Sequence, residues 1–106
     1  MSTDIKEKII TLAELVSYQE GSIVSREIIK KDTGTVTVFA FDKGQGLSEH
    51  TAPFDAMVHI LDGTANIRIG ERSFDVKVGE SIVMPANKPH SLQAKEKFKM
   101  LLIMVK

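Results

Sequence analysis

Short apolar runs separated by glycine-containing turns fill the sequence from residue 22 onwards, and this succession limits the possible folds more than any other feature. Many short runs rich in β-branched and aromatic residues predict an antiparallel sandwich or a barrel. We expect eight or nine strands, a core barrel over about residues 22–106, and one domain over residues 1–106. The clearest runs are Ile23–Ile29, Thr35–Phe41, Met57–Leu61, Ala65–Ile69, Phe74–Val78, Ser81–Met84, His90–Gln93 and Phe98–Val105.

Local signals add a helical turn and two tight turns. Thr11 and Glu14 have the capping-box spacing, in which each side chain bonds the main-chain amide of the other residue. The apolar positions that follow have helical spacing and end before Gly21, so a turn or two of helix is predicted. Gly70-Glu71 predicts a type II′ hairpin, and Gly79-Glu80 predicts a second one.

Two of the runs carry apolar or β-branched residues on both faces, which indicates strands that are buried on both sides. They are Thr35–Phe41 and Phe98–Val105. In a small barrel one face fills the lumen, so the other face needs a cover that 106 residues are too few to supply. We therefore expect a homodimer.

Composition excludes several classes of protein. The 14 Lys and Arg residues balance the 14 Asp and Glu residues, whereas nucleic-acid binding needs surplus cations, so no nucleic-acid partner is expected. The longest unbroken apolar run, Met100–Val105, is too short to cross a bilayer, so no membrane partner is expected either. The charged N-terminus does not resemble a signal peptide, which predicts a cytoplasmic protein. The absence of Cys excludes disulfides, thiolate metal sites and thiol catalysis.

The chain has three histidines, and two of them, His50 and His90, follow glycine turns in the predicted barrel. The setting of His50 resembles the first motif of the cupin family, which runs Gly, five residues, His, one residue, His, three or four residues, Glu, six residues, Gly. The positions that match this motif are Gly44, His50, Ala52, Ala56 and Gly63.

The setting of His90 resembles the second cupin motif, which runs Gly, five residues, Pro, one residue, Gly, two residues, His, three residues, Asn. The matching positions are Gly79, Pro85, Asn87, His90 and Ala94. Asn tolerates the left-handed backbone of the motif glycine, so the turn at position 87 should be kept. The resemblance covers roughly half of the chain and implies a cupin-type jelly-roll β-barrel, or double-stranded β-helix, with all-β structure.

The departures from the family pattern lie at the metal ligands. In metal-binding cupins, both histidines and the Glu of the first motif, together with the His of the second, hold a divalent ion. Here Ala52 and Ala56 replace two of these four groups, and only His50 and His90 are present. Two imidazoles leave Mn, Fe, Ni or Zn short of the three or four protein ligands of a tight site, so we expect metal binding to be weak or absent.

His59 is the natural candidate for a third metal ligand. Counted from Ala56, simple strand alternation turns His59 away from the lumen. A bulge near Pro53 would shift the phase and allow a site of His50, His59 and His90. Both orientations stay open from the sequence.

Three functions follow as hypotheses. In the first, the lumen binds a small organic ligand, with His50 and His90 as polar contacts and Phe54 and Met84 near the mouth. The two imidazoles would then bind an acidic group or act as an acid–base pair near neutral pH. The second is a metal-dependent enzyme of oxygenase, isomerase or epimerase type that uses His50, His90 and a third ligand. The third is a sensing or accessory module without catalysis.

Overall fold

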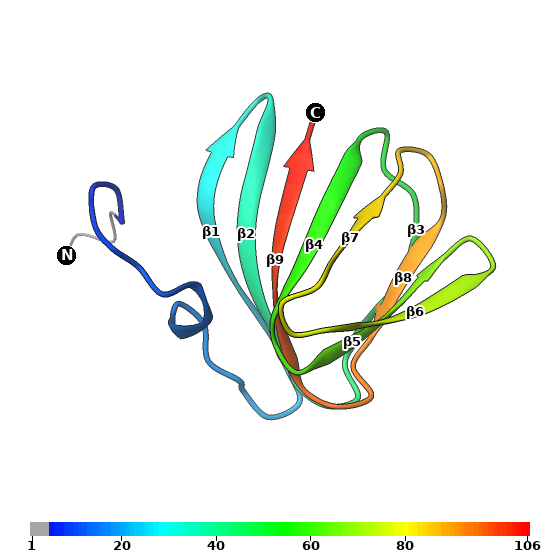
Figure 1. The fold of residues 1–106 in the computed structure, drawn as a ribbon, viewed down its shortest axis with the longest axis horizontal. Helices are drawn as coiled ribbons and strands as arrows, with labels where there is room; N and C mark the ends of the chain where they lie inside the picture. The colour runs from blue at the N-terminus through cyan, green and yellow to red at the C-terminus, as the bar shows by residue number, and fades with distance from the viewer. Residues whose placement is uncertain (1–4) are drawn as a thin grey trace.

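Two antiparallel β-sheets face each other in the computed structural model, which describes residues 5–106 (Figure 1). The first sheet has the strand order β1-β2-β9-β4-β7, and the second has the order β3-β8-β5-β6. The bounds are β1 Ile23–Lys31, β2 Gly34–Phe41, β3 Gly46–His50, β4 Asp55–Asp62, β5 Thr64–Ile69, β6 Arg72–Lys77, β7 Ser81–Met84, β8 His90–Gln93 and β9 Phe98–Val105.

This arrangement confirms the all-β jelly-roll, or double-stranded β-helix, that the sequence predicts. The eight clearest runs all form strands, and β3 is the ninth. Alternation directs one set of side chains inward from each sheet, as in β4, where Ala56, Val58 and Ile60 are buried. Phe41 and Phe98 are fully buried in the same core, and their stacked rings lie 4.5 Å apart between centroids. Burial of each such side chain contributes about 1.5–3 kcal/mol.

The two predicted hairpin turns have different outcomes. Gly70 has φ +60°, Glu71 stays outside the left-handed region, and β5 pairs with β6 across them, as a type II′ turn requires. The hairpin predicted at Gly79-Glu80 is wrong, because β6 and β7 belong to different sheets. This turn instead carries the chain from one sheet to the other, and β6 ends at Lys77.

Gly63 makes the connection in the opposite direction, from β4 in the first sheet to β5 in the second. Its φ is +72°, and a Cβ at this position would collide with the main-chain carbonyl oxygen of Lys97. Both the conformation and the close approach therefore require glycine. Gly79, with φ +84°, has no atom close to the position of a Cβ, so only its conformation favours glycine.

The N-terminal segment forms one 3₁₀ turn, Leu12–Glu14, and the predicted capping box is wrong. The Thr11 side chain makes no capping bond; its carbonyl oxygen accepts from the Glu14 amide at 2.9 Å. Val16 and its apolar neighbours nevertheless pack against Val38 and Ala40 of β2. This segment therefore covers part of the outer face of the first sheet. Within residues 5–106, no helix has the length and hydropathy needed to cross a bilayer.

Candidate functional site

His50 and His90 are paired directly across β3 and β8. Their Nε2 atoms lie 3.1 Å apart, and the rings meet edge to face with centroids 4.4 Å apart. His50 is the last residue of β3, and His90 is the first residue of β8. The fold therefore brings together two residues that are forty positions apart in the sequence.

A β-bulge determines the direction of the His50 side chain. Leu47 pairs with Leu92 and His50 pairs with His90, so β3 advances three residues while β8 advances two. Without the extra residue, strand alternation would turn His50 to the opposite face from Leu47. With it, Leu47 and His50 both line one cavity between the sheets.

The two rings are held by bonds to main-chain carbonyls. The Nδ1 atom of His50 lies 2.8 Å from the carbonyl oxygen of Ser48, and that of His90 lies 3.2 Å from the carbonyl oxygen of Lys88. A carbonyl oxygen only accepts, so each Nδ1 carries a proton and donates it. Each ring consequently directs its Nε2 atom at the other ring.

The loops that carry the histidines are tied to each other. Asn87 has φ +63°, which confirms the left-handed turn expected there, and its amide donates to the Ala52 carbonyl oxygen at 2.7 Å. The adjacent Ala86 amide donates to Oδ1 of Asp55 at 2.8 Å. These bonds link the loop before β8 to Ala52 and to the first residue of β4, which limits the freedom of the His50–His90 pair.

The cavity beside the pair has a volume of about 60 Å³ and mostly apolar walls. His90 is 6% exposed, whereas His50 is exposed, so the cavity opens on the His50 side. The volume is about that of two water molecules in the liquid. The lining residues are Leu47, His50, Ala52, Ala56, Met84, His90, Leu92, Met100, Leu102 and Met104.

Burial controls the charge of the inner ring. Loss of hydration lowers the pKa of His90 below its ordinary value of 6.5, and the neighbouring charge of His50 acts in the same direction. The bond to the Lys88 carbonyl opposes this shift. His90 is therefore neutral at physiological pH, with an acceptor Nε2 directed at His50.

The structure does not bring His59 to this pair. The pairing of β4 with β7 and β9 is regular from Ala56 to His59, so no bulge changes the phase before His59. His59 lies on the outer face of the first sheet, where its Nδ1 is 2.6 Å from Oγ of Ser81. It is not among the cavity-lining residues, so the predicted site of three histidines does not form.

Of the two residues predicted near the lumen mouth, Met84 lines the cavity and Phe54 does not. The Phe54 ring lies instead beneath the Lys106 ammonium, 5.5 Å from its centroid. Sequence reasoning did not include Leu102 and Met104 of β9 in the site. Their contribution depends on how β9, the central strand of the first sheet, faces β8, which strand alternation alone does not reveal.

The donor set does not fit a tightly held metal ion. The 3.1 Å between the two Nε2 atoms is close to the separation of two adjacent ligands on one ion. Ala52 and Ala56 line the cavity at the other two motif positions and offer no donor. Within residues 5–106, no group of three or more His, Asp or Glu side chains could hold an ion.

Comparisons with known proteins agree with this architecture. The family described as Cupin domain matches residues 37–106. A conserved protein of unknown function from Streptococcus pyogenes is 41% identical with a TM-score of 0.92, and the match covers 100% of this chain and 96% of that one. No curated protein matches the chain.

Two further solved structures are similar over most of this chain. A cupin 2 conserved barrel domain protein from Leptotrichia buccalis is 49% identical with a TM-score of 0.89; the match covers 92% of this chain and 47% of that one, so this chain spans about half its length. A cupin superfamily protein from Desulfitobacterium hafniense is 29% identical with a TM-score of 0.89, and 94% of this chain and 92% of that one are covered.

Proposed function

This chain belongs to the cupin family, whose members often bind metals, and we propose that its own lumen binds a small organic acid with little or no metal. The observation that carries the proposal is the close approach of two Nε2 atoms at the edge of an apolar cavity. His50 and His90 would be the polar contacts of the ligand.

The imidazole pair has room for one further proton, on one of its two facing Nε2 atoms. Because both Nδ1 atoms donate to carbonyls, two neutral rings direct lone pairs at each other across 3.1 Å. A proton on either Nε2 converts this repulsion into a hydrogen bond and gives the site one positive charge. A second added proton would place two cations in contact, so the pair takes up at most one.

A small carboxylic acid provides what the pair lacks. One Nε2 takes up a proton from solvent as the carboxylate binds, and the carboxylate then lies beside the resulting imidazolium. A short hydrocarbon part fits the apolar wall of Met84, Met100 and Met104, whose unbranched side chains can adjust to different shapes. A cavity of about 60 Å³ favours ligands of only a few non-hydrogen atoms.

The metal-dependent enzyme is less well supported, because the site offers two nitrogen donors and no carboxylate. Metal analysis after purification without a nickel column separates the two functions. Near-stoichiometric Mn, Fe, Ni or Zn that is lost in His50→Ala or His90→Ala would support the enzyme and contradict our proposal.

Calorimetric titration with acetate, propionate and butyrate tests the proposal directly, with propionamide as the uncharged control ligand. We expect saturable binding of at least one carboxylate and none of the amide. His50→Gln and His90→Gln should weaken binding by roughly 10- to 100-fold, as expected for loss of a hydrogen bond to a charged group.

His59→Gln is the matched control, since it removes the same side chain from the outer face. It should leave carboxylate affinity unchanged. Equal loss in all three variants, or no carboxylate binding at the solubility limit, would contradict the proposed function.

A further inference from the structure

A crevice of about 250 Å³ is lined by residues of both sheets, on the side of the molecule where the edge strands β6 and β7 lie (Figure 1). Ligand pockets usually have volumes of roughly 300–1,000 Å³, so a crevice of this size suits a ligand with a single ring. The lining residues are Ile69, Arg72, Phe74, Ile82, Val83, Pro85 and Lys88. No described residue lines both this crevice and the cavity beside His50 and His90.

The apolar wall of the crevice comes from the inner faces of the two sheets. Phe74 is paired with the fully buried Ile67, and Arg72 is paired with Ile69, which is only 7% exposed. Paired residues of an antiparallel sheet point to the same side, so Phe74 and Arg72 both project toward the first sheet. From that sheet, Ile82 of β7 packs against the same core as Phe74. A ring that enters the crevice therefore meets apolar side chains from both sheets.

Two cations border this apolar wall. The Arg72 guanidinium lies over the Phe74 ring, 5.1 Å from its centroid. The Lys88 side chain lies over the turn of the β5–β6 hairpin, with Cε 3.0 Å from the position that a Cβ of Gly70 would take. The Gly70 amide donates to the Pro89 carbonyl oxygen at 2.8 Å. This bond holds the loop that carries Lys88 beside the turn that precedes Arg72.

The charges of the crevice favour an anion. Its described lining contains no acidic residue, so neither cation meets a carboxylate there. A guanidinium binds a carboxylate through two parallel hydrogen bonds, and an ammonium adds a compact positive charge. The Phe74 ring next to Arg72 offers a stacking surface for a second ring. A carboxylate attached directly to an aromatic ring satisfies both the charged edge and the apolar wall.

We propose that the crevice binds a small aromatic carboxylate, with Arg72 and Lys88 on the carboxylate and Phe74, Ile69 and Ile82 against the ring. The cavity beside His50 and His90, of about 60 Å³, is too small for an aromatic ring. The crevice is therefore a second site, and this inference does not depend on the ligand proposed for the lumen.

An NMR titration of the isotope-labelled full chain with benzoate tests the site. We expect saturable shifts of the amide signals of Ile69, Phe74 and Ile82, with a dissociation constant of about 0.1–1 mM. Benzamide, which has no charge, and benzylamine, a cation with the same ring, are the control ligands. Both should bind about tenfold or more weakly than benzoate, because they do not form the charged hydrogen bonds to Arg72.

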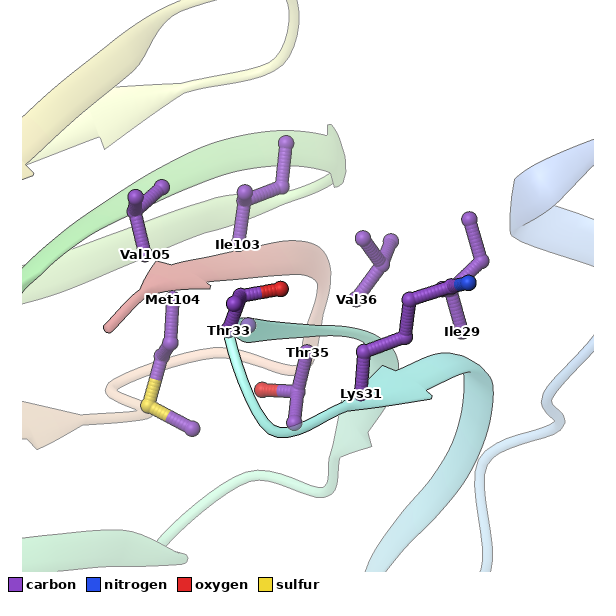
Figure 2. Close-up of a pocket in the computed structure, with 9 residues that line it drawn as sticks. Ile29, Lys31, Thr33, Thr35, Val36, Ile103, Met104 and Val105 are labelled. Carbon is purple, nitrogen blue, oxygen red and sulfur yellow. The ribbon is translucent and has the colours of Figure 1, made fainter.

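Substitutions test the two cations. Arg72→Gln should raise the dissociation constant for benzoate by roughly 10- to 100-fold and Lys88→Gln by about 3- to 10-fold, while Arg72→Lys, which keeps the charge without the planar fork, should fall between wild type and Arg72→Gln. Lys31→Gln is the matched control and should have no effect. Figure 2 shows Lys31 at a hollow of about 230 Å³ whose described lining has apolar side chains but no aromatic ring and no second cation.

The two sites are distinguished in the same titration. His50→Gln should leave the affinity for benzoate unchanged, because its side chain lies outside the crevice. Shifts confined to residues of the other cavity, such as Leu47 and Ala52, would place benzoate in the lumen and overturn the proposal. So would benzoate binding that Arg72→Gln does not weaken, equal binding of benzamide, or no saturable binding at about 10 mM.

Discussion

Raising the pH above neutrality should weaken carboxylate binding, because the proposed complex holds one more proton than the free protein. In the proposed complex the bound anion is stabilised by a proton shared by His50 and His90, whereas burial, which lowers the pKa of His90, keeps that ring neutral in the free protein in this range. Binding is then linked to uptake of one proton, and the dissociation constant rises tenfold per pH unit, or about 1.4 kcal/mol. The ligand itself stays ionised throughout, because carboxyl groups titrate near pH 4.

The geometry sets the upper limit of this slope. Both Nδ1 protons are already present and donated to carbonyls, so only the facing Nε2 atoms can take up a proton. Their 3.1 Å separation excludes two facing N–H groups. A slope of two would require a second cation that the described chain does not place in the cavity wall.

Calorimetry in two buffers of different ionisation enthalpy measures proton uptake directly. Titrations at about pH 7.5 and 8.5 should give close to one proton per carboxylate and up to a tenfold loss of affinity. His59→Gln should behave as the wild type, and His90→Gln should lose the pH dependence together with most of the affinity. Binding without proton uptake, or with unchanged affinity at both pH values, would refute the shared-proton reasoning.

Three further predictions concern stability. The Oγ1 atom of Thr35 is buried without a hydrogen-bond partner in the described chain, so Thr35→Val should raise the free energy of unfolding by about 1 kcal/mol, seen as a melting temperature about 4–8 °C higher. Gly79→Ala should lower the free energy of unfolding by about 1–2 kcal/mol because alanine disfavours the left-handed conformation. Gly63→Ala should lower it further, because its Cβ would also meet a carbonyl oxygen. Urea denaturation that gives equal losses for the two variants would contradict this. The pKa of His90 is lowered in the folded state, so the unfolded chain binds a proton first as the pH falls through 6.5. The wild type should therefore lose more stability than His90→Gln between about pH 7.5 and 5.5. If the melting temperatures of the two proteins change in parallel with pH, the shift is absent.

The strand pattern of this chain could be predicted because glycine turns and alternation act locally. The hairpin at Gly70 follows from a two-residue turn that only certain backbone conformations close. The error at Gly79-Glu80 has a physical cause, since the same tight turn serves either to join neighbouring strands or to pass between layers. The outcome depends on which sheet has room for β7, and this is a property of the whole barrel.

The capping box predicted at Thr11 and Glu14 is wrong because the helical segment is too short for it. Thr11 and Glu14 have the right chemistry, but the helical segment has only three residues and a 3₁₀ hydrogen-bond pattern. The Glu14 amide donates to the main-chain carbonyl oxygen of Thr11, so this amide is not left for the Thr11 hydroxyl to cap. Packing of Val16 against the sheet, rather than helix propensity, holds this segment in place.

In the candidate site, the position of His90 was predictable from its motif, whereas the direction of His50 was not deducible from periodicity. Alternation from Leu47 gives the wrong face for His50, and alternation from Ala56 gives the right face for His59. The difference is one irregular residue in β3 that no propensity marks. The size of the cavity was also hidden, because it depends on methionine packing across both sheets.

Because one extra residue in β3 sets the direction of the His50 side chain, the chemistry of this cavity depends on the length of that strand as well as on the residues in it. Deleting one residue between Leu47 and His50 would keep the composition of the lumen-facing segment nearly intact, yet it would rotate the imidazole out to solvent. Homologous barrels that differ by a single-residue gap at this point would therefore differ in what their interiors can hold, even where every motif histidine aligns.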